Sequence, residues 1–172
     1  MTSRKNWINA VAITIVSFLT TVSVHAQDAH PCFDLASLQG NYAIIGTYGA
    51  NVAIALAKRY MDGKGNLTGT FIVNEPLAGS TTVQRNIVSG TQVGTITVNC
   101  DGTGVVTRIL TVGGVQTQQF DDFVITQAII EDGHLIATSV ADAQRTPSTI
   151  VAGGIFLTRV WTRLPSHESH KD

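Results

Sequence analysis

Glycine-containing turn signals that recur roughly every ten residues constrain this chain more than any other feature. The segment 62–66, Asp-Gly-Lys-Gly-Asn, is a strong hairpin signal because Gly and Asn accept a positive φ. Similar signals stand at 101–104, 113–114 and 132–133. The runs between them are rich in Val, Ile and Thr, which favour strands. The pattern predicts consecutive antiparallel hairpins.

Strand-like runs cover 41–48, 52–61, 67–73, 81–88, 92–100, 105–112, 115–131, 134–141 and 150–164. We expect an all-β, antiparallel up-and-down barrel of about eight strands, because closure removes exposed strand edges. A two-sheet β-sandwich is the alternative. Helix is expected only as a short turn within 32–38.

The N-terminus reads as a secretory signal peptide. Arg4 and Lys5 precede an apolar run from Trp7 to Leu19, and the small residues Val24 and Ala26 mark a cleavage site. The expected organisation is a signal peptide at 1–26, an N-terminal segment at 27–39, a barrel at 40–164 and a flexible tail at 165–172. The protein is therefore predicted to be secreted or periplasmic, with no membrane span after signal removal.

Cys32 and Cys100 both follow the predicted cleavage site. In an oxidising compartment they are expected to form a disulfide, worth roughly 4 kcal/mol on the chain-entropy model; two buried thiols are the alternative. The basic residues are scattered along the chain and form no stripe, which argues against a nucleic-acid partner.

Four short motifs resemble a known family. They are Cys32 followed by Leu-Gln-Gly-Asn-Tyr at 38–42, the hairpin at 60–69, the Cys-containing hairpin at 98–104, and Phe-Val-Ile at 123–125. Together they resemble small secreted bacterial proteins with a calycin-like barrel, related in fold to lipocalins and allene oxide cyclase. The resemblance implies the barrel fold and implies no specific activity.

A second resemblance is to the lipocalin-type barrel opening. Gly40 and Tyr42 are similar to its Gly-x-Trp triplet, and Arg159 and Arg163 flank Trp161 on the last strand. This implies an aromatic side chain at the barrel floor covered by a guanidinium. The alternative is an ordinary core edge with exposed arginines.

The predicted function is binding of a small apolar ligand inside the barrel. The side chains expected to face inward are Tyr42, Ile44, Ile54, Leu56, Phe71, Phe123, Ile125 and Trp161. Two alternatives stay open. One is a barrel isomerase or cyclase resembling allene oxide cyclase or dirigent proteins, and the other is a structural or surface-interaction module with a filled barrel.

No catalytic or metal-binding constellation is evident, so an enzyme is left open but is not favoured, and neither a metal nor a cofactor is expected. Asp121 and Asp122 point to opposite faces of a straight strand, which would bring one carboxylate into the barrel. A bulge or bend that places both in water is the favoured interpretation. His167 and His170 fall in the tail.

The two strands at 41–48 and 52–61 are apolar on both faces. A strand that is apolar on both sides is usually covered on both sides. We expect the cover to be a second copy of the chain, giving a homo-oligomer, or the helical turn at 32–38.

Overall fold

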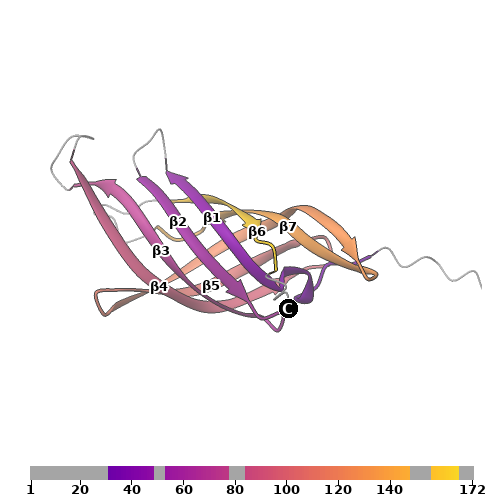
Figure 1. Cartoon of the computed structure of the whole chain (residues 1–172). Helices are drawn as coiled ribbons and strands as arrows, with labels where there is room; N and C mark the ends of the chain where they lie inside the picture. Colours follow the sequence, from indigo (N-terminus) through magenta and orange to yellow (C-terminus); the bar gives the residue numbers. More distant parts are fainter. Residues whose placement is uncertain (1–30, 49–52, 78–83, 148–155, 167–172) are drawn as a thin grey trace, which may run out of the picture.

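The computed structural model describes residues 31–48, 53–77, 84–147 and 156–166. Eight antiparallel strands follow one another in chain order, and the last pairs with the first to close a barrel (Figure 1). This confirms the predicted all-β up-and-down barrel. A short 3-10 helix, η1 (Ala36–Leu38), precedes β1 (Gly40–Tyr48), β2 (Ala53–Met61), β3 (Asn66–Pro76), β4 (Arg85–Val98), β5 (Thr103–Val112), β6 (Val115–Glu131), β7 (His134–Gln144) and β8 (Thr158–Arg163).

Two predictions of local structure were wrong. Strand β4 is continuous where a break was predicted between 88 and 92. Gly90 leaves room for the ring of Phe71 there, since a Cβ at this position would lie 2.6 Å from that ring. Strand β6 does not bend at Asp121 and Asp122, and its register shift lies between Ile125 and Ala128. The predicted signal peptide at 1–26 lies outside the described residues.

One end of the barrel, here called the lower end, is covered by the closing segment, residues 31–39. Cys32 is bonded to Cys100, as predicted, and the Phe33 N–H donates to the Cys100 carbonyl at 3.2 Å. Leu38 is fully buried in the lower apolar core. Helix η1 packs against β7, so the prediction that this segment covers the outer face of the first two strands was wrong.

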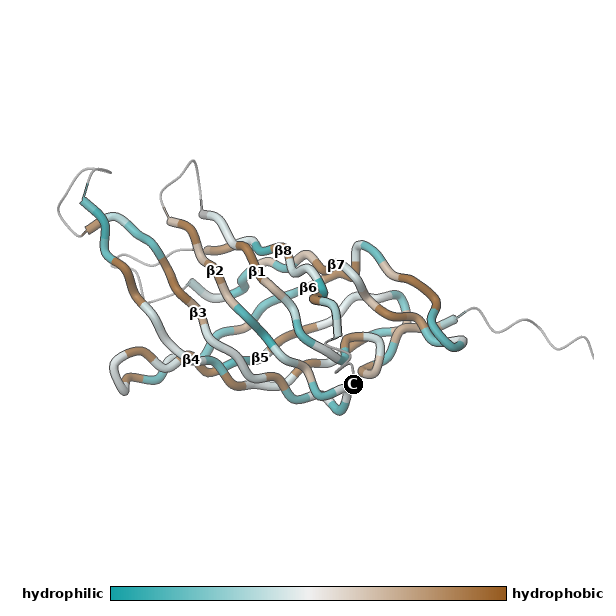
Figure 2. The backbone as a smooth tube through the Cα atoms, in the orientation of Figure 1, coloured by the Kyte–Doolittle hydropathy of each residue, from teal (hydrophilic) through white to brown (hydrophobic). Residues whose placement is uncertain are grey.

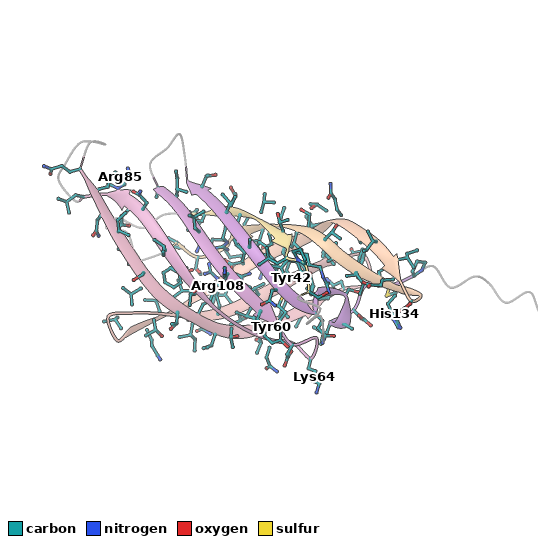
Figure 3. All side chains as sticks on the ribbon, viewed as in Figure 1. Tyr42, Tyr60, Lys64, Arg85, Arg108 and His134 are labelled. Atoms are coloured by element: carbon teal, nitrogen blue, oxygen red, sulfur yellow. A yellow bond between two sulfur atoms is a disulfide. The ribbon has the colours of Figure 1, made fainter. Side chains whose placement is uncertain are left out.

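Along β2 and β5 the side chains alternate between the interior and the outer surface. Figure 2 shows hydrophobic and hydrophilic stretches interspersed along the strands. Figure 3 shows Arg108 and Tyr42 within the barrel, whereas Lys64 projects from its surface. The apolar interior consists of a lower cluster that includes Tyr42 and Trp161 and a second cluster towards the opposite, upper end. The upper cluster comprises Ala53, Ala55, Phe71, Val73, Leu110 and Leu157.

Candidate functional site

A layer of charged and amide side chains crosses the interior between the two apolar clusters. Six strands or their ends contribute to it, because period-two alternation turns these positions inward on each strand. All members are buried, and we call them the polar layer: Arg59, Gln92, Arg108, Gln119, Asp121, Asp142, Gln144 and Arg159.

Asp121 is held by two guanidinium groups. Arg108 Nε donates to its Oδ2 at 2.6 Å and Arg108 Nη2 to its Oδ1 at 3.2 Å. Arg159 Nη2 forms an ion pair with Oδ1, also at 2.6 Å. Burial alone would raise the pKa of Asp121, but Arg159 and Arg108 outweigh it and hold this pKa below its ordinary value.

Asp142 links the polar layer to the lower core. Its two oxygens accept from Arg159 Nε at 2.8 and 3.0 Å, and Oδ2 also accepts from Trp161 Nε1 at 2.6 Å. Burial raises the pKa of Asp142, opposed by Arg159 and Arg59. Both carboxylates of the polar layer are thus occupied as acceptors.

Arg59 differs from the other two interior arginines because it contacts no carboxylate among the described residues. Its Nη2 donates to Gln92 Oε1 at 3.1 Å, and its guanidinium lies 4.3 Å from the centre of the Trp161 ring. Its Nε and Nη1 atoms have no hydrogen-bond partner within the described part of the chain. Burial, reinforced by the neighbouring Arg108, lowers the pKa of Arg59 to about 9.

A small cavity of about 30 Å³ lies above Arg59. Three inward alanines of β2, Ala53, Ala55 and Ala57, run from the upper end of the strand to Arg59, and the last two line the cavity. We call them the alanine row. Their methyl groups leave space that larger side chains would fill, and this volume accommodates about two water molecules or one carboxylate group.

The structure places most of the predicted ligand-binding side chains inside the barrel. Tyr42, Ile44, Phe71, Phe123 and Trp161 are buried there, and Ile125 is half-buried against the lower cluster. Tyr42, Ile44, Phe123 and Trp161 belong to the lower core, and Ile125 packs against it. Ile44 and Phe71 also line the cavity.

Ile54 and Leu56 do not face inward, and this part of the prediction was wrong. Ile54 is 40% exposed and Leu56 is 53% exposed on the outer surface. The inward positions of β2 belong to the alanine row instead. Small side chains are needed there because the long side chain of Arg59 and the ring of Phe71 extend into the same interior.

The favoured interpretation of Asp121 and Asp122 was also wrong. Because β6 stays straight at this point, Asp121 enters the barrel and only Asp122 reaches the surface, where it pairs with Arg145. Two arginines lie against aromatic rings in the floor. Arg163 lies beside the opening aromatic, Tyr42, with which it is paired across β1 and β8, and Arg59 covers Trp161. Tyr42 packs edge-on against Trp161, with ring centres 6.3 Å apart.

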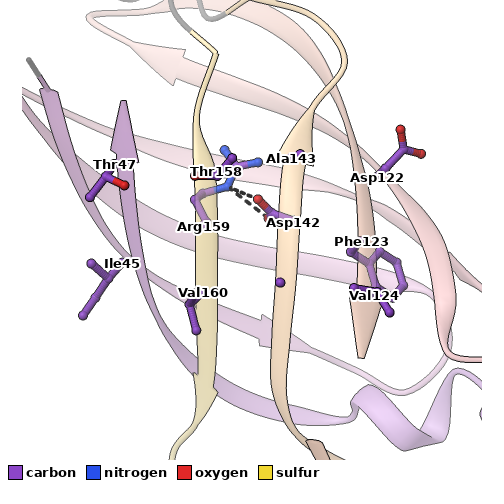
Figure 4. A pocket seen from close by; sticks show the side chains of 11 residues that line it. Ile45, Thr47, Asp122, Phe123, Val124, Asp142, Ala143, Thr158, Arg159 and Val160 are labelled. Atoms are coloured by element: carbon purple, nitrogen blue, oxygen red, sulfur yellow. Dashed lines mark hydrogen bonds and ion pairs between the residues drawn. The ribbon is translucent and has the colours of Figure 1, made fainter. Parts of the chain in front are cut away.

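A larger depression of about 770 Å³ lies on the outer surface over β6, β7, β8 and β1 (Figure 4). In this depression Ala141 lies between the longer side chains of Val124 and Val160, and Ala143 lies between Asp122 and Thr158. Arg159 belongs to its lining, but its guanidinium turns away to Asp142. The two buried polar residues of its lining, Arg159 and Asp142, are paired with each other, so the interior is the better candidate site among the described residues.

Within the described residues, no three His, Cys, Asp or Glu side chains come together to hold a metal ion. No helix in this part of the chain is long and apolar enough to cross a membrane. Comparison with protein-family models, curated proteins and solved structures finds no match for the chain.

Proposed function

We propose that this protein is an exported barrel that binds a small organic molecule in its interior, along the alanine row and above Arg59. The observation that carries the proposal is the row itself, because three successive small inward residues lead from the strand end to a cavity with unsatisfied donors. Ligand sites typically combine apolar walls with a few convergent polar groups.

Two features support the assignment to an exported protein. The first is the signal-like sequence at the N-terminus. The second is the Cys32–Cys100 bond, since disulfides persist in oxidising compartments. The proposed location is periplasmic or extracellular.

Binding is favoured over catalysis by the state of the two carboxylates in the polar layer. Asp121 and Asp142 each accept from arginine, and Asp142 also accepts from the indole of Trp161. A general acid or base would need one of them to exchange a proton with a substrate, and breaking a buried ion pair to allow this is costly.

The test is a binding titration that uses octanol, octanoate and octylamine on the protein without residues 1–26. Trp161 is then its only tryptophan, and its fluorescence reports on the polar layer. At least one of the compounds should bind at one site per chain. Ala55→Leu should abolish this binding, because the added side chain fills the cavity.

Ile54→Leu is the matched control, because it alters the neighbouring residue on the outer face of the same strand. It should leave binding unchanged. Circular dichroism checks that both variants remain folded. The proposed function is wrong if none of the three compounds binds, or if Ala55→Leu, while folded, binds as the native chain does.

A further inference from the structure

The charges of the polar layer do not balance among the described residues. Three guanidinium groups face two carboxylates, and both carboxylates are occupied by Arg108 and Arg159. Glu75 on β3 is the remaining buried acid; its Oε1 accepts from Asn86 Nδ2 at 3.0 Å, and its Oε2 has no hydrogen-bond partner among the described residues. It lies about 20 Å along the strand from Gly69, the residue paired with Arg59, so it does not neutralise this guanidinium.

A second unsatisfied donor lies beside the same cavity. The Leu157 N–H donates to Gln144 Oε1 at 2.7 Å, which fixes the orientation of that amide. Gln144 Nε2 then donates to Gln119 Oε1 at 2.8 Å, so the Nε2 of Gln119 is directed elsewhere. This atom is buried without a partner among the described residues, and both Gln119 and Arg59 line the cavity.

Buried donors of this kind are costly to leave unsatisfied, and an unpaired buried charge is more costly still. Water in the cavity would satisfy hydrogen bonds but would not neutralise the charge. A carboxylate would do both, because its two oxygens accept several bonds and match the planar guanidinium. The cavity itself has room for the carboxylate alone, so a hydrocarbon tail would lie among the apolar side chains above it, Ala55, Leu110 and Leu157, which would have to part to admit it.

We infer that the ligand is an organic carboxylate with an apolar tail, whose carboxylate accepts hydrogen bonds from Arg59 and Gln119. The inference rests on the proposed function, because it names the chemical class of the molecule bound at that site. Asp121 and Asp142 do not oppose it, since Arg108 and Arg159 neutralise both.

The test compares octanoate, octanol and octylamine on the native chain and on Arg59→Gln. Octanoate should bind the native chain about tenfold to a hundredfold more tightly than octanol, the range typical of a hydrogen bond to a charged group. Arg59→Gln should remove this preference and leave octanol binding unchanged. Lys58→Gln removes the same charge from the outer face of β2 and should change nothing.

Sodium chloride and sodium acetate separate the possible anions. Acetate should compete weakly, because it has the carboxylate but not the tail, and chloride should not compete at equal ionic strength, because it has neither. If chloride displaces octanoate as effectively as acetate does, the site is a simple anion site and the inference fails. If Arg59→Gln unfolds, Arg59→Lys is the second variant. It keeps the positive charge but loses the planar guanidinium, so it should retain part of the preference for octanoate over octanol.

The two proposals fail differently in this experiment. If none of the three compounds binds, the proposed function fails and the inference falls with it. If octanol or octylamine binds as tightly as octanoate, or if Arg59→Gln keeps the octanoate preference, only the carboxylate inference is overturned.

Discussion

Asp121 and Asp122 are neighbours in the chain and lie in opposite environments. Asp121 is fully buried between Arg108 and Arg159, whereas Asp122 pairs with Arg145 on the surface. Nothing in the two residues themselves decides which enters the barrel. The decision comes from the register with β5, which places Asp121 diagonally beside Arg108.

We predict that Asp121→Asn lowers the free energy of unfolding by about 3–5 kcal/mol, because it leaves buried guanidinium charge uncompensated. Asp122→Asn is the matched control and should cost far less, since solvent screens the surface pair. Urea unfolding of both variants measures the difference. If both variants lose the same free energy of unfolding, Asp121 is not the buried partner of Arg108 and Arg159.

The contribution of Asp121 to stability should depend on pH. The pKa of Asp121 is lowered in the folded protein, so its stabilising contribution is present above the ordinary carboxyl pKa and is lost as the pH falls through the folded value. The stability difference between the native chain and Asp121→Asn should therefore shrink in strong acid. A difference that stays constant on acidification would contradict this assignment.

Arg59 predicts a pH dependence of binding at the alkaline end. Its pKa in the folded protein is lowered to about 9, and a bound carboxylate would raise it by stabilising the charged form. Octanoate affinity should be constant near neutral pH. It should fall about tenfold per pH unit between the pKa of Arg59 in the free protein and its raised pKa in the complex. Calorimetric titration measures it, with octanol as the ligand that should show no such fall.

At the scale of the elements, β2 shows why the sequence could not identify the interior row. One face carries Ile54 and Leu56 and then Lys58, and the other carries the alanine row and then Arg59. Both rows are apolar and both end in a basic residue, so hydropathy favours the larger side chains. The structure buries the smaller ones because the interior must also hold Arg59 and Phe71.

The turns were more informative than the strand faces. The Gly63, Gly102 and Gly133 signals all mark real hairpins, where positive φ angles are required. A hairpin at Gly113 and Gly114 also fixes the pairing of Arg108 with Gln119, which was a usable signal for the polar layer. The contact of Arg59 with Trp161 had no such signal, because β2 and β8 are not paired in the sheet.

The closing segment depends on its disulfide. We predict that Cys100→Ser lowers the free energy of unfolding by up to about 4 kcal/mol, because the unfolded chain loses a large closed loop. Cys32→Ser should have the same effect, since each removes the same bond. Denaturant unfolding of the native chain with and without reductant provides the check. If the unfolding midpoint is the same for Cys100→Ser, Cys32→Ser, the reduced native chain and the oxidised native chain, the disulfide has no stabilising role.

At the scale of the whole molecule, the outer surface carries an apolar row that crosses six neighbouring strands. Its members are paired side by side in the sheet: Val124, Ala141, Val160, Ile45, Leu56 and Ile72. Five of them, all except Ala141, are exposed large hydrophobic residues. The structure leaves this row uncovered by the described residues, so the predicted homo-oligomer stays a prediction.

We expect this row to associate with a second copy of the chain. Light scattering should give a mass above that of one chain, and Ile45→Asp should reduce it to the monomer by placing a charge in the contact. Val115→Asp is the control, because Val115 is equally apolar and exposed but lies at the β5–β6 hairpin, away from the row. A native chain that is monomeric at high concentration would contradict the prediction.

The central claim is that the ligand lies inside the barrel, at the alanine row and Arg59, and not in the outer groove. Nuclear magnetic resonance of methyl groups and arginine Nε–H groups during an octanoate titration tests it most directly. The account predicts saturable shifts at the Ala55 and Ala57 methyls and at Arg59 Nε–H, with Ile45 and Val160 unchanged. Shifts confined to Ile45, Val124 and Val160, or no saturable shift at all, would contradict it.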